Sequence, residues 1–362
     1  MKRDMTSRER VQAAFEHREP DRVPAWCGAS PEFRELARRY AGLRDDEALS
    51  VHLGDDFRRV WARYKGPPER SPSSCFLHPE ATSRTPFGVE RRGYGYGQPL
   101  AHPLAGAETV ADVERFPWPD SEWMDVSPVR KDALQWNGAF AILGGDWSPF
   151  FHDAIDLFGM VRFMTLLIDA PEIVDIALDR IVEYYTVVSR RIFEAARGAI
   201  DIFFIGNDFG TQVGPAVGEA MFRRFFLPRL RRLVALGHEF GLKVMLHCCG
   251  GFALLIPAMI GIGLDALQSL QPDARGMEPA RLKVDFGSRI VLNGCIDTHR
   301  LLIEGTPDLV RRRVQEILEV MKPGGGYIAS PSHDYLLPET PVANVLAMYE
   351  TVRAYGRYGG SP

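Results

Sequence analysis

The sequence lacks the features that would place it in several broad classes of protein. Its 362 residues include five cysteines, an odd number with two of them adjacent, so no disulfide framework is indicated. The 47 acidic and 43 basic residues nearly balance, for a net charge of −4, which argues against nucleic acid or an acidic membrane as a general partner. No apolar run reaches the length of a transmembrane helix.

The first residues also lack the pattern of a secretory signal. They are MKRDMTSRERVQAAF, with charges where a signal peptide needs an apolar core. Hydrophobic residues make up 46% of the chain and charged residues 25%, which is ordinary for a globular protein. At this length a hydrophobic core needs no support from a disulfide or a structural metal. We therefore expect a cytoplasmic globular protein, with oligomer formation left open.

Short apolar runs alternate with helical stretches from about residue 139, a pattern that predicts parallel βαβ units. A Thr-x-x-Glu capping box predicts a helix over Thr6–His17, and Thr306-Pro307 and Thr340-Pro341 each place a capping Thr before a Pro at the first helical position. Further helices are predicted over 172–198, 216–240, 251–262, 277–286 and 306–322. The predicted strands are AFAILGG, DIFFIGND, KVMLHCCG, LDALQSL, RIVLNGCID and GYIASPSH.

Two earlier strands, near Val23–Trp26 and Phe57–Tyr64, complete a set of eight. Eight strands fit a closed (β/α)8 TIM barrel better than a doubly wound sheet, and no GxGxxG motif follows an early strand. Residues 66–128 are rich in Pro, Gly, Ser and aromatic residues, and we interpret them as a long loop-rich insertion with short hairpins. The prediction is an α/β fold with one TIM-barrel domain over residues 1–362.

Polar residues directly follow most of the predicted strands. In a parallel barrel the carboxyl ends of all strands meet at one rim, where such enzymes carry out their chemistry. The sequence therefore predicts a site at this rim. Its candidate residues are Asp146 and Trp147 after the third strand, Asn207 and Asp208 after the fourth, His247 and Cys249 after the fifth, Asp273 after the sixth and His333 after the eighth.

The motif His247-Cys248-Cys249 indicates a metal site within this set. Residues i and i+2 of an extended chain point the same way, so His247 and Cys249 face one ligand while Cys248 turns outward. Imidazole and thiolate are ligands that zinc favours, and a catalytic zinc site has three protein ligands and one open position. His333 is the natural third ligand, and Asp273 is an alternative oxygen ligand. The competing interpretation is that both cysteines are small buried hydrophobic residues and His247 is a hydrogen-bonded strand-end residue.

Asp208 and His333 are the candidate catalytic residues. A carboxylate that follows a buried strand is costly to desolvate without a partner, so Asp208 is expected to bind a substrate cation or take up a proton. In the competing interpretation Asp208 caps the turn that follows it. The residues predicted to bind substrate are Asn207, Asp146, Trp147 and Gln212.

Five segments of the chain resemble the uroporphyrinogen decarboxylase superfamily. They are DRVPAW, GNDFGTQVGP, GLKVMLHCCG, GCIDTHRLL and GGGYIASPSHDYLLPETPVANV. The resemblance extends from about residue 5 to residue 356 and implies a TIM barrel. It also implies one of two chemistries, which are cofactor-free decarboxylation of uroporphyrinogen and zinc-dependent methyl transfer that involves a corrinoid protein.

Two departures from the patterns of this superfamily bear on that choice. Similar decarboxylases carry a Met-Arg-Gln-Ala-Gly-Arg stretch after the first strand, whose arginines hold the carboxylates of the tetrapyrrole. Here Trp26 is followed by CGASPEFREL, so that stretch is missing. Corrinoid-dependent relatives bind zinc with H-x-C and a final Cys. This chain keeps His247 and Cys249 but has Ser330-Pro331-Ser332-His333 where the final Cys is expected, so the resemblance implies a set of two histidines and one cysteine.

The resemblance and the H-x-C motif together imply a zinc-dependent methyltransferase. The enzyme would move a methyl group between a small methylated substrate or thiol and a corrinoid, either methylcobalamin or a corrinoid protein partner. A neutral or cationic substrate is expected, unless loops carry Arg58, Arg59 and Arg84 into the pocket. Two alternatives stay open. One is a metal-free, decarboxylase-like lyase that acts on a smaller carboxylic acid through Asp208 and His333, and the other is a non-catalytic barrel that binds a corrinoid or tetrapyrrole.

Overall fold

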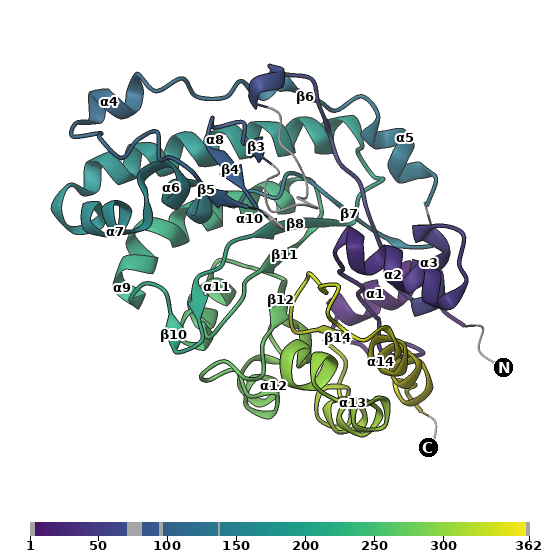
Figure 1. Ribbon diagram of the computed structural model, residues 1–362. Coiled ribbons are helices and arrows are strands. Elements are labelled where there is room, and N and C mark those ends of the chain that lie inside the picture. Colours follow the sequence, from purple (N-terminus) through teal and green to yellow (C-terminus); the bar gives the residue numbers. More distant parts are fainter. Residues whose placement is uncertain (1–3, 71–81, 94–96, 137, 360–362) are drawn as a thin grey trace.

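A seven-stranded parallel sheet forms the centre of the computed structural model, which describes residues 4–70, 82–93, 97–136 and 138–359 (Figure 1). Every pairing within this sheet is parallel, and the strands follow one another around it in chain order. The strands are β1 (Phe57–Arg59), β7 (Ala141–Gly144), β8 (Ile202–Gly206), β11 (Lys243–His247), β12 (Ala266–Leu270), β13 (Val291–Ile296) and β14 (Tyr327–Pro331).

The sheet is strongly curled. Alternate residues of a strand point to the same face, and on the concave face the side chains of all seven strands meet in one buried cluster. A second, larger cluster packs the outer face of the sheet against the helices, as burial of apolar surface on both faces of a parallel sheet requires. The inner cluster contains Phe57, Leu143, Ile202, Phe204, Met245, Ala266, Val291 and Ile328, together with Trp26 and Val11, Ala14 and Phe15 of the first helix.

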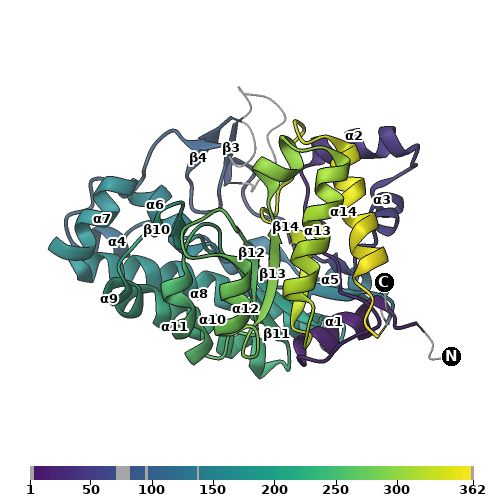
Figure 2. The same ribbon diagram turned by 90° about the horizontal axis from the view of Figure 1, so that it is seen from below.

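Helices surround the outer face of this sheet (Figures 1 and 2). No helix in the described part of the chain is both long enough and apolar enough to cross a membrane. The longer helices are α1 (Ser7–Phe15), α2 (Pro31–Ala41), α3 (Asp46–Leu53), α6 (Phe150–Phe158), α7 (Met160–Asp169), α8 (Pro171–Ala195), α10 (Leu227–Glu239), α12 (Pro279–Phe286), α13 (Pro307–Met321) and α14 (Val342–Tyr355). The shorter ones are η1 (Pro68–Arg70), α4 (Val110–Glu114), η2 (Ser121–Trp123), α5 (Val129–Leu134), α9 (Glu219–Met221), η3 (Phe222–Phe226), η4 (Ala253–Leu255), α11 (Ile256–Gly261) and η5 (Thr298–Ile303).

The predicted first strand, Val23–Trp26, is present only as an isolated bridge. Ala25 pairs in parallel with Ala329 of β14, whose carbonyl accepts the backbone N–H of Trp26 at 3.0 Å. On the other side, the carbonyl of Ala25 accepts the backbone N–H of Asp56, one residue before β1, at 2.9 Å. The other seven predicted strands are confirmed as members of one sheet. The fold is therefore mixed α/β with a curled parallel sheet, consistent with a TIM-like fold.

Two of the three predicted helix caps are confirmed. Thr6 caps α1 with a complete capping box, and Thr306 caps α13 with a Pro at its first turn. The prediction for Thr340 is wrong. Pro341 has an extended ψ of 121°, so α14 begins one residue later, at Val342, with no side-chain cap. The shift removes the Thr340 hydroxyl from the first free N–H groups of the helix.

The predicted insertion, residues 66–128, contains short paired strands among its described residues. Three of them form a small antiparallel sheet, made of β3 (Thr82–Arg84), β4 (Glu90–Arg92) and β5 (Gln98–Pro99), and β3 and β4 project to one side of the main sheet (Figure 2). β6 (Met124–Asp125) of the insertion pairs with β2 (Arg63–Tyr64), which precedes it. Outside the insertion, β9 (Gly210–Thr211) pairs with β10 (Gly214–Pro215). Cys75 of the insertion lies outside the described residues.

Candidate metal centre

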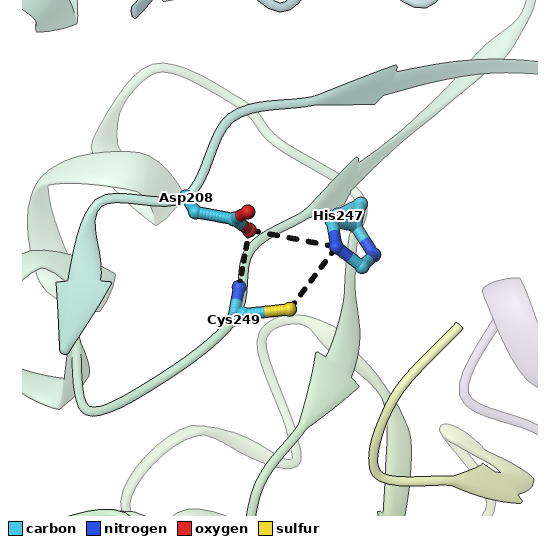
Figure 3. Close-up of side chains that lie close together, drawn as sticks. All are labelled: Asp208, His247 and Cys249. Carbon is cyan, nitrogen blue, oxygen red and sulfur yellow. Dashed lines mark hydrogen bonds and ion pairs between the residues drawn. The ribbon is translucent and has the colours of Figure 1, made fainter. Parts of the chain in front are cut away.

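Three side chains with metal-binding atoms meet at the carboxyl ends of β8 and β11 (Figure 3). His247 is the last residue of β11, and its Nε2 lies 3.2 Å from the Sγ of Cys249. Asp208, two residues after β8, brings its Oδ1 to 3.4 Å from the same Nε2. Among the described residues, the ligand atoms of Asp208, His247 and Cys249 all lie within 4.8 Å of one another. The structure therefore forms a compact group of one nitrogen, one sulfur and one oxygen donor.

Glycines allow the two loops that carry this group to approach each other. A Cβ on Gly210 would lie 2.3 Å from the carbonyl oxygen of Cys249. A Cβ on Gly250 would lie 2.6 Å from the backbone of Gly210, and Gly250 has a φ of +80° that favours glycine. The backbone N–H of Cys249 then donates to Asp208 Oδ1 at 2.7 Å. Backbone contact between the loops thus sets the position of Asp208 against the H-x-C motif.

Cys248 points away from this group. It is fully buried, and its Sγ accepts the backbone N–H of Phe209 at 3.3 Å. Burial, followed by the charge of Asp208, raises the pKa of the Cys248 and Cys249 thiols well above the usual range. In the absence of a cation Cys249 is therefore a neutral thiol at neutral pH, and a cation at its Sγ would stabilise the thiolate. The four described cysteines are free.

Two histidines flank the carboxylate of Asp208. Nε2 of His152, from α6, lies 3.3 Å from Oδ2, while Oδ1 faces His247 and the backbone of Cys249. Burial alone would raise the pKa of Asp208, but the hydrogen bond from His152 and the charges of both histidines hold it well below its usual range. Asp208 is therefore an ionised acceptor whose two oxygens are held in different directions.

The geometry of the group fits a tetrahedral zinc ion. Zinc–nitrogen and zinc–oxygen bonds of about 2.0–2.2 Å and zinc–sulfur bonds of about 2.3 Å place tetrahedral ligand atoms roughly 3.3–3.6 Å apart. The separations from His247 Nε2, 3.2 Å to Cys249 and 3.4 Å to Asp208, are close to these values. Three protein ligands would leave one position open, the arrangement found in catalytic rather than structural zinc sites.

The two residues predicted as the third zinc ligand lie outside this compact group. His333 is near, with its ring centroid 6.4 Å from that of His247, and its Nδ1 accepts the backbone N–H of Tyr335 at 3.1 Å. Burial, and then the charge of His247, lowers the pKa of His333, which favours a neutral imidazole. Asp273 is exposed in the turn after β12 and does not reach the group. The nearest third donor is the carboxylate of Asp208.

The residues predicted to bind substrate occupy different environments. Trp147 packs its ring against Gly206, where a Cβ would lie 2.0 Å away, and its ring centroid is 5.3 Å from that of His247. Asn207 is fully buried, and its amide donates to the carbonyl of Ser148 and accepts the backbone N–H of Phe151, both at 3.0 Å. Asn207 therefore fixes the segment that carries Trp147. Gln212 is exposed.

A cavity of about 850 Å³ adjoins the metal-binding group and shares Trp147 as a wall. His247 and Cys249 are not among the described lining residues, but the ring of His247 contacts that of Trp147. Asp146 lines the cavity as well, next to Trp147. The aromatic part of the lining consists of Trp26, Phe57, Trp61, Tyr64, Phe87, Trp147, Tyr184, Tyr185 and Tyr335. A cavity with aromatic walls and polar groups among them is the usual form of a small-molecule site.

Arg58 and Arg59 line the cavity, whereas Arg84 does not. Arg58 donates from Nε and Nη2 to both carboxylate oxygens of Glu47, at 2.8 and 2.7 Å. The guanidinium of Arg59 lies over the ring of Trp61, 3.5 Å from its centroid. Arg84 forms an exposed pair with a glutamate. The guanidinium of Arg58 is thus already engaged by a carboxylate within the protein.

Three carboxyl groups in the cavity wall have raised pKa values. Burial raises the pKa of Asp55 and Asp153 to about 7 and that of Asp146 to about 6. Hydrogen bonds oppose burial at Asp153, where the hydroxyl of Tyr185 donates at 2.5 Å, and at Asp146, where the backbone of Ser148 donates. These acids are partly protonated near neutral pH.

The raised pKa of Asp153 predicts a pH-dependent effect of Asp153→Asn on stability. The carboxyl group of Asp153 keeps its proton up to about pH 7 in the folded state but only to about pH 4 in the unfolded state. Between these pH values its ionisation favours the unfolded state, so Asp153 destabilises the fold increasingly as pH rises. The variant removes that loss, and its stability relative to the parent should increase by roughly 2–3 kcal/mol from pH 5 to pH 8. Urea unfolding at both pH values measures it. Asp308→Asn, at a side chain 84% exposed, is the control, and parallel behaviour of the two variants would contradict the prediction.

Sequence reasoning missed three residues that contact the metal-binding group or its neighbours. His152 lies in α6, which none of the helices predicted from the sequence covers. Gln268 accepts from His247 Nδ1 through its Oε1 at 2.5 Å, and its Nε2 donates to Asp334 Oδ1 at 2.9 Å. The position of Asp334, directly after the predicted His333, was the one available signal.

The comparisons with known proteins identify the family of this chain. Residues 109–355 match the family described as Uroporphyrinogen decarboxylase (URO-D). Because the match covers more than half of the chain, the protein belongs to this family. A relative from Syntrophotalea carbinolica, named uroporphyrinogen decarboxylase, is 27% identical over 256 residues, which cover 67% of this chain and 69% of the relative. A methyltransferase from Methanosarcina mazei shares the fold, with a TM-score of 0.66, 20% identity, and coverage of 97% of this chain and 99% of the other.

Proposed function

We propose that this protein is a zinc-dependent methyltransferase that moves a methyl group between a small methylated substrate or thiol and a corrinoid. The observation that carries the proposal is the convergence of His247, Cys249 and Asp208 beside an aromatic cavity. The likeness to a methyltransferase over nearly the whole chain supports the same reading at the level of the fold. Membership of the URO-D family is compatible with it.

In this proposal His247, Cys249 and Asp208 would hold the zinc ion, with the imidazole of His333 close to that of His247. Bound zinc lowers the pKa of a thiol or an alcohol, or polarises a methoxy oxygen, so that the methyl group is transferred near neutral pH. His152 binds the second oxygen of Asp208 and keeps Oδ1 directed at His247. A cation between the carboxylate of Asp208 and the buried Sγ of Cys249 would stabilise the charge of the carboxylate and the thiolate form of the cysteine.

In this proposal the substrate occupies the cavity. Asn207 fixes the segment that carries Trp147, and Trp147 separates the cavity from the imidazole of His247. Aromatic walls favour an apolar or cationic body, and the acids Asp146 and Asp153 favour hydrogen-bond donors over a further carboxylate. The corrinoid, free or on a partner protein, would approach from the rim at which the metal-binding group lies.

We further propose that the parallel sheet closes into an eight-stranded barrel through Val23–Trp26. The backbone hydrogen bonds from this segment to Ala329 on one side and from Asp56 on the other support closure. Closure would bring the carboxyl ends of β1 and β14 to the same rim as those of β8 and β11.

The function is tested with purified full-length protein, by measuring zinc content and methyl transfer from methylcobalamin to 2-mercaptoethanol under anaerobic conditions. In this reaction the cobalt–carbon bond breaks with its electron pair left on cobalt, a sulfur–carbon bond forms, and the thiol proton is released. The expected result is bound zinc, formation of cob(I)alamin seen by absorbance, and methylated thiol seen by mass spectrometry. Zinc-free protein with no transfer in either direction would refute the proposal.

The main competing function is decarboxylation. Incubation with uroporphyrinogen is expected to give no coproporphyrinogen. Four described arginines line the cavity, Arg34, Arg58, Arg59 and Arg91, but Arg58 is engaged by Glu47 and Arg91 by Asp156, and Asp146 and Asp153 in the same wall oppose further carboxylates. Decarboxylation at an enzymatic rate would overturn the methyltransferase proposal whatever the zinc content. The variant Cys249→Ala serves as the control for both assays, since it removes a proposed zinc ligand and leaves the cavity lining unchanged.

A further inference from the structure

Gln268 connects the metal-binding group to the cavity wall. It lies on β12 opposite His247 of β11 in the parallel pairing, and its side chain is fully buried. Its amide contacts His247 Nδ1 at one end and Asp334 Oδ1 at the other. Asp334 lines the cavity. One buried amide therefore separates the imidazole from a carboxylate that faces the cavity.

The direction of each hydrogen bond in this chain follows from Trp26. Its indole Nε1 can only donate, and it lies 2.6 Å from Asp334 Oδ1, so that oxygen is an acceptor. The Gln268 atom 2.9 Å from the same oxygen must then be the amide nitrogen, because an amide oxygen there would face a second acceptor. The amide oxygen consequently faces His247 Nδ1 at 2.5 Å, and Nδ1 must carry the hydrogen.

This orientation determines which nitrogen of His247 has a free lone pair. With the hydrogen on Nδ1, the lone pair of Nε2 points toward Cys249 Sγ and Asp208 Oδ1. Without Gln268, the carboxylate of Asp208 would favour a hydrogen on Nε2, which blocks coordination there. A ligating histidine generally needs a fixed acceptor at its other nitrogen.

We propose that Gln268 and Asp334 are positioning residues that hold His247 in the Nδ1–H tautomer and so prepare Nε2 to bind a metal. Gly28 keeps Asp334 in place, because a Cβ at Gly28 would lie 2.2 Å from the Asp334 carbonyl oxygen and 2.3 Å from its Oδ1. The expected effect of Gln268 and Asp334 on zinc affinity rests on the proposed function, because it requires that the site binds zinc. Their effect on the tautomer of His247 does not depend on the proposed function.

The tautomer is measured by NMR on metal-free, full-length protein with ¹⁵N-labelled histidine, at a pH where the imidazole is neutral. The signals of His247 are assigned with His247→Gln. The parent is expected to show Nδ1 protonated and Nε2 bare, and Gln268→Leu is expected to move the hydrogen to Nε2. The conservative variant Gln268→Glu should keep the parent tautomer, since one carboxyl oxygen accepts from Nδ1 and the other, protonated because it faces Asp334 Oδ1, donates to that oxygen.

Zinc affinity, measured by competition with a chromophoric chelator, gives the second readout. Gln268→Leu is expected to bind zinc about 10–100-fold more weakly than the parent, and Gln268→Glu should keep most of the parent affinity. Asp334→Ala is expected to weaken zinc binding in the same direction and replaces Gln268→Leu if the latter does not fold. An Nε2–H tautomer in the parent would overturn the proposal. If the tautomers are as expected but neither the parent nor any variant binds zinc, the positioning role is upheld and the proposed function is refuted.

Discussion

Cys249→Ala is expected to lose zinc completely at micromolar metal, while Cys248→Ala retains it. The two cysteines are adjacent, yet the Sγ of Cys249 lies 3.2 Å from His247 Nε2 and that of Cys248 accepts a backbone hydrogen bond from Phe209. Loss of a directly bound thiolate should weaken zinc binding by more than the roughly 100-fold that follows loss of an outer contact. Methyl transfer should fall with metal content.

Metal content after dialysis, and the thiolate-to-cobalt absorption band after loading with Co²⁺, measure this prediction. The band is expected in the parent and in Cys248→Ala and absent from Cys249→Ala. Circular dichroism shows whether Cys248→Ala, which opens a small gap in a fully buried position, still folds. Zinc loss in Cys248→Ala together with zinc retention in Cys249→Ala would show that the alternation of side chains after β11 has been misread.

The sequence sufficed to predict the strand ends and the H-x-C geometry, because both depend on local pattern. Six apolar runs bounded by turn residues became strands of one sheet, and the i, i+2 alternation of an extended chain directed His247 and Cys249 together and Cys248 away. The weak run near Phe57 also became a strand, whereas the run near Val23 contributes only one bridged residue. The prediction therefore placed the residues that directly follow these strands at the correct edge of the sheet, the one formed by the carboxyl ends of the strands.

The partners of the H-x-C motif could not be predicted, because they depend on contacts between distant loops. Asp208 reaches His247 since Gly210 and Gly250 let two backbones touch, and nothing in the local sequence records that approach. Asp273 satisfied the same rule of following a strand, but the turn after β12 leaves it exposed. The rule identifies an edge of the sheet, not a distance between side chains.

Gln268 illustrates a second limit of prediction from sequence patterns. It lies within the predicted strand LDALQSL, which has other polar residues and no signal that singles out Gln268. Only the structure shows its amide between His247 and Asp334. For Asn207 the pattern gave a signal that did not match its contacts. Its position after a strand predicted contact with substrate, but its side-chain amide is buried and forms hydrogen bonds with backbone groups. Polarity at a strand end does not distinguish a residue that meets substrate from one that holds a loop.

Asp56→Ala is expected to destabilise the fold by about 3–5 kcal/mol, the usual cost of removing one partner from a buried ion pair. Asp56 is fully buried between β1 and the N-terminal segment. Its Oδ1 accepts from Arg10 at 2.6 Å and from Arg22 at 3.0 Å, and its Oδ2 accepts from Arg22 at 3.0 Å and from the backbone N–H of Ala25 at 2.8 Å. The variant would leave the largely buried guanidinium of Arg10 with Asp21 as its remaining carboxylate partner.

The carboxylate of Asp56 also joins the two edges of the curled sheet, because Ala25 is the residue bridged to β14. Its loss should therefore weaken the segment proposed to close the barrel as well as the ion pair itself. Urea unfolding followed by circular dichroism measures the change, with Glu239→Ala as the control, since the Arg190–Glu239 pair is exposed and should contribute at most about 1 kcal/mol. Hydrogen exchange should increase at the N–H groups of Asp56, Trp26 and Ala329, which bond across this segment. If Asp56→Ala were no less stable than Glu239→Ala, the ion pair would not hold this edge, and closure would rest on the backbone bonds alone.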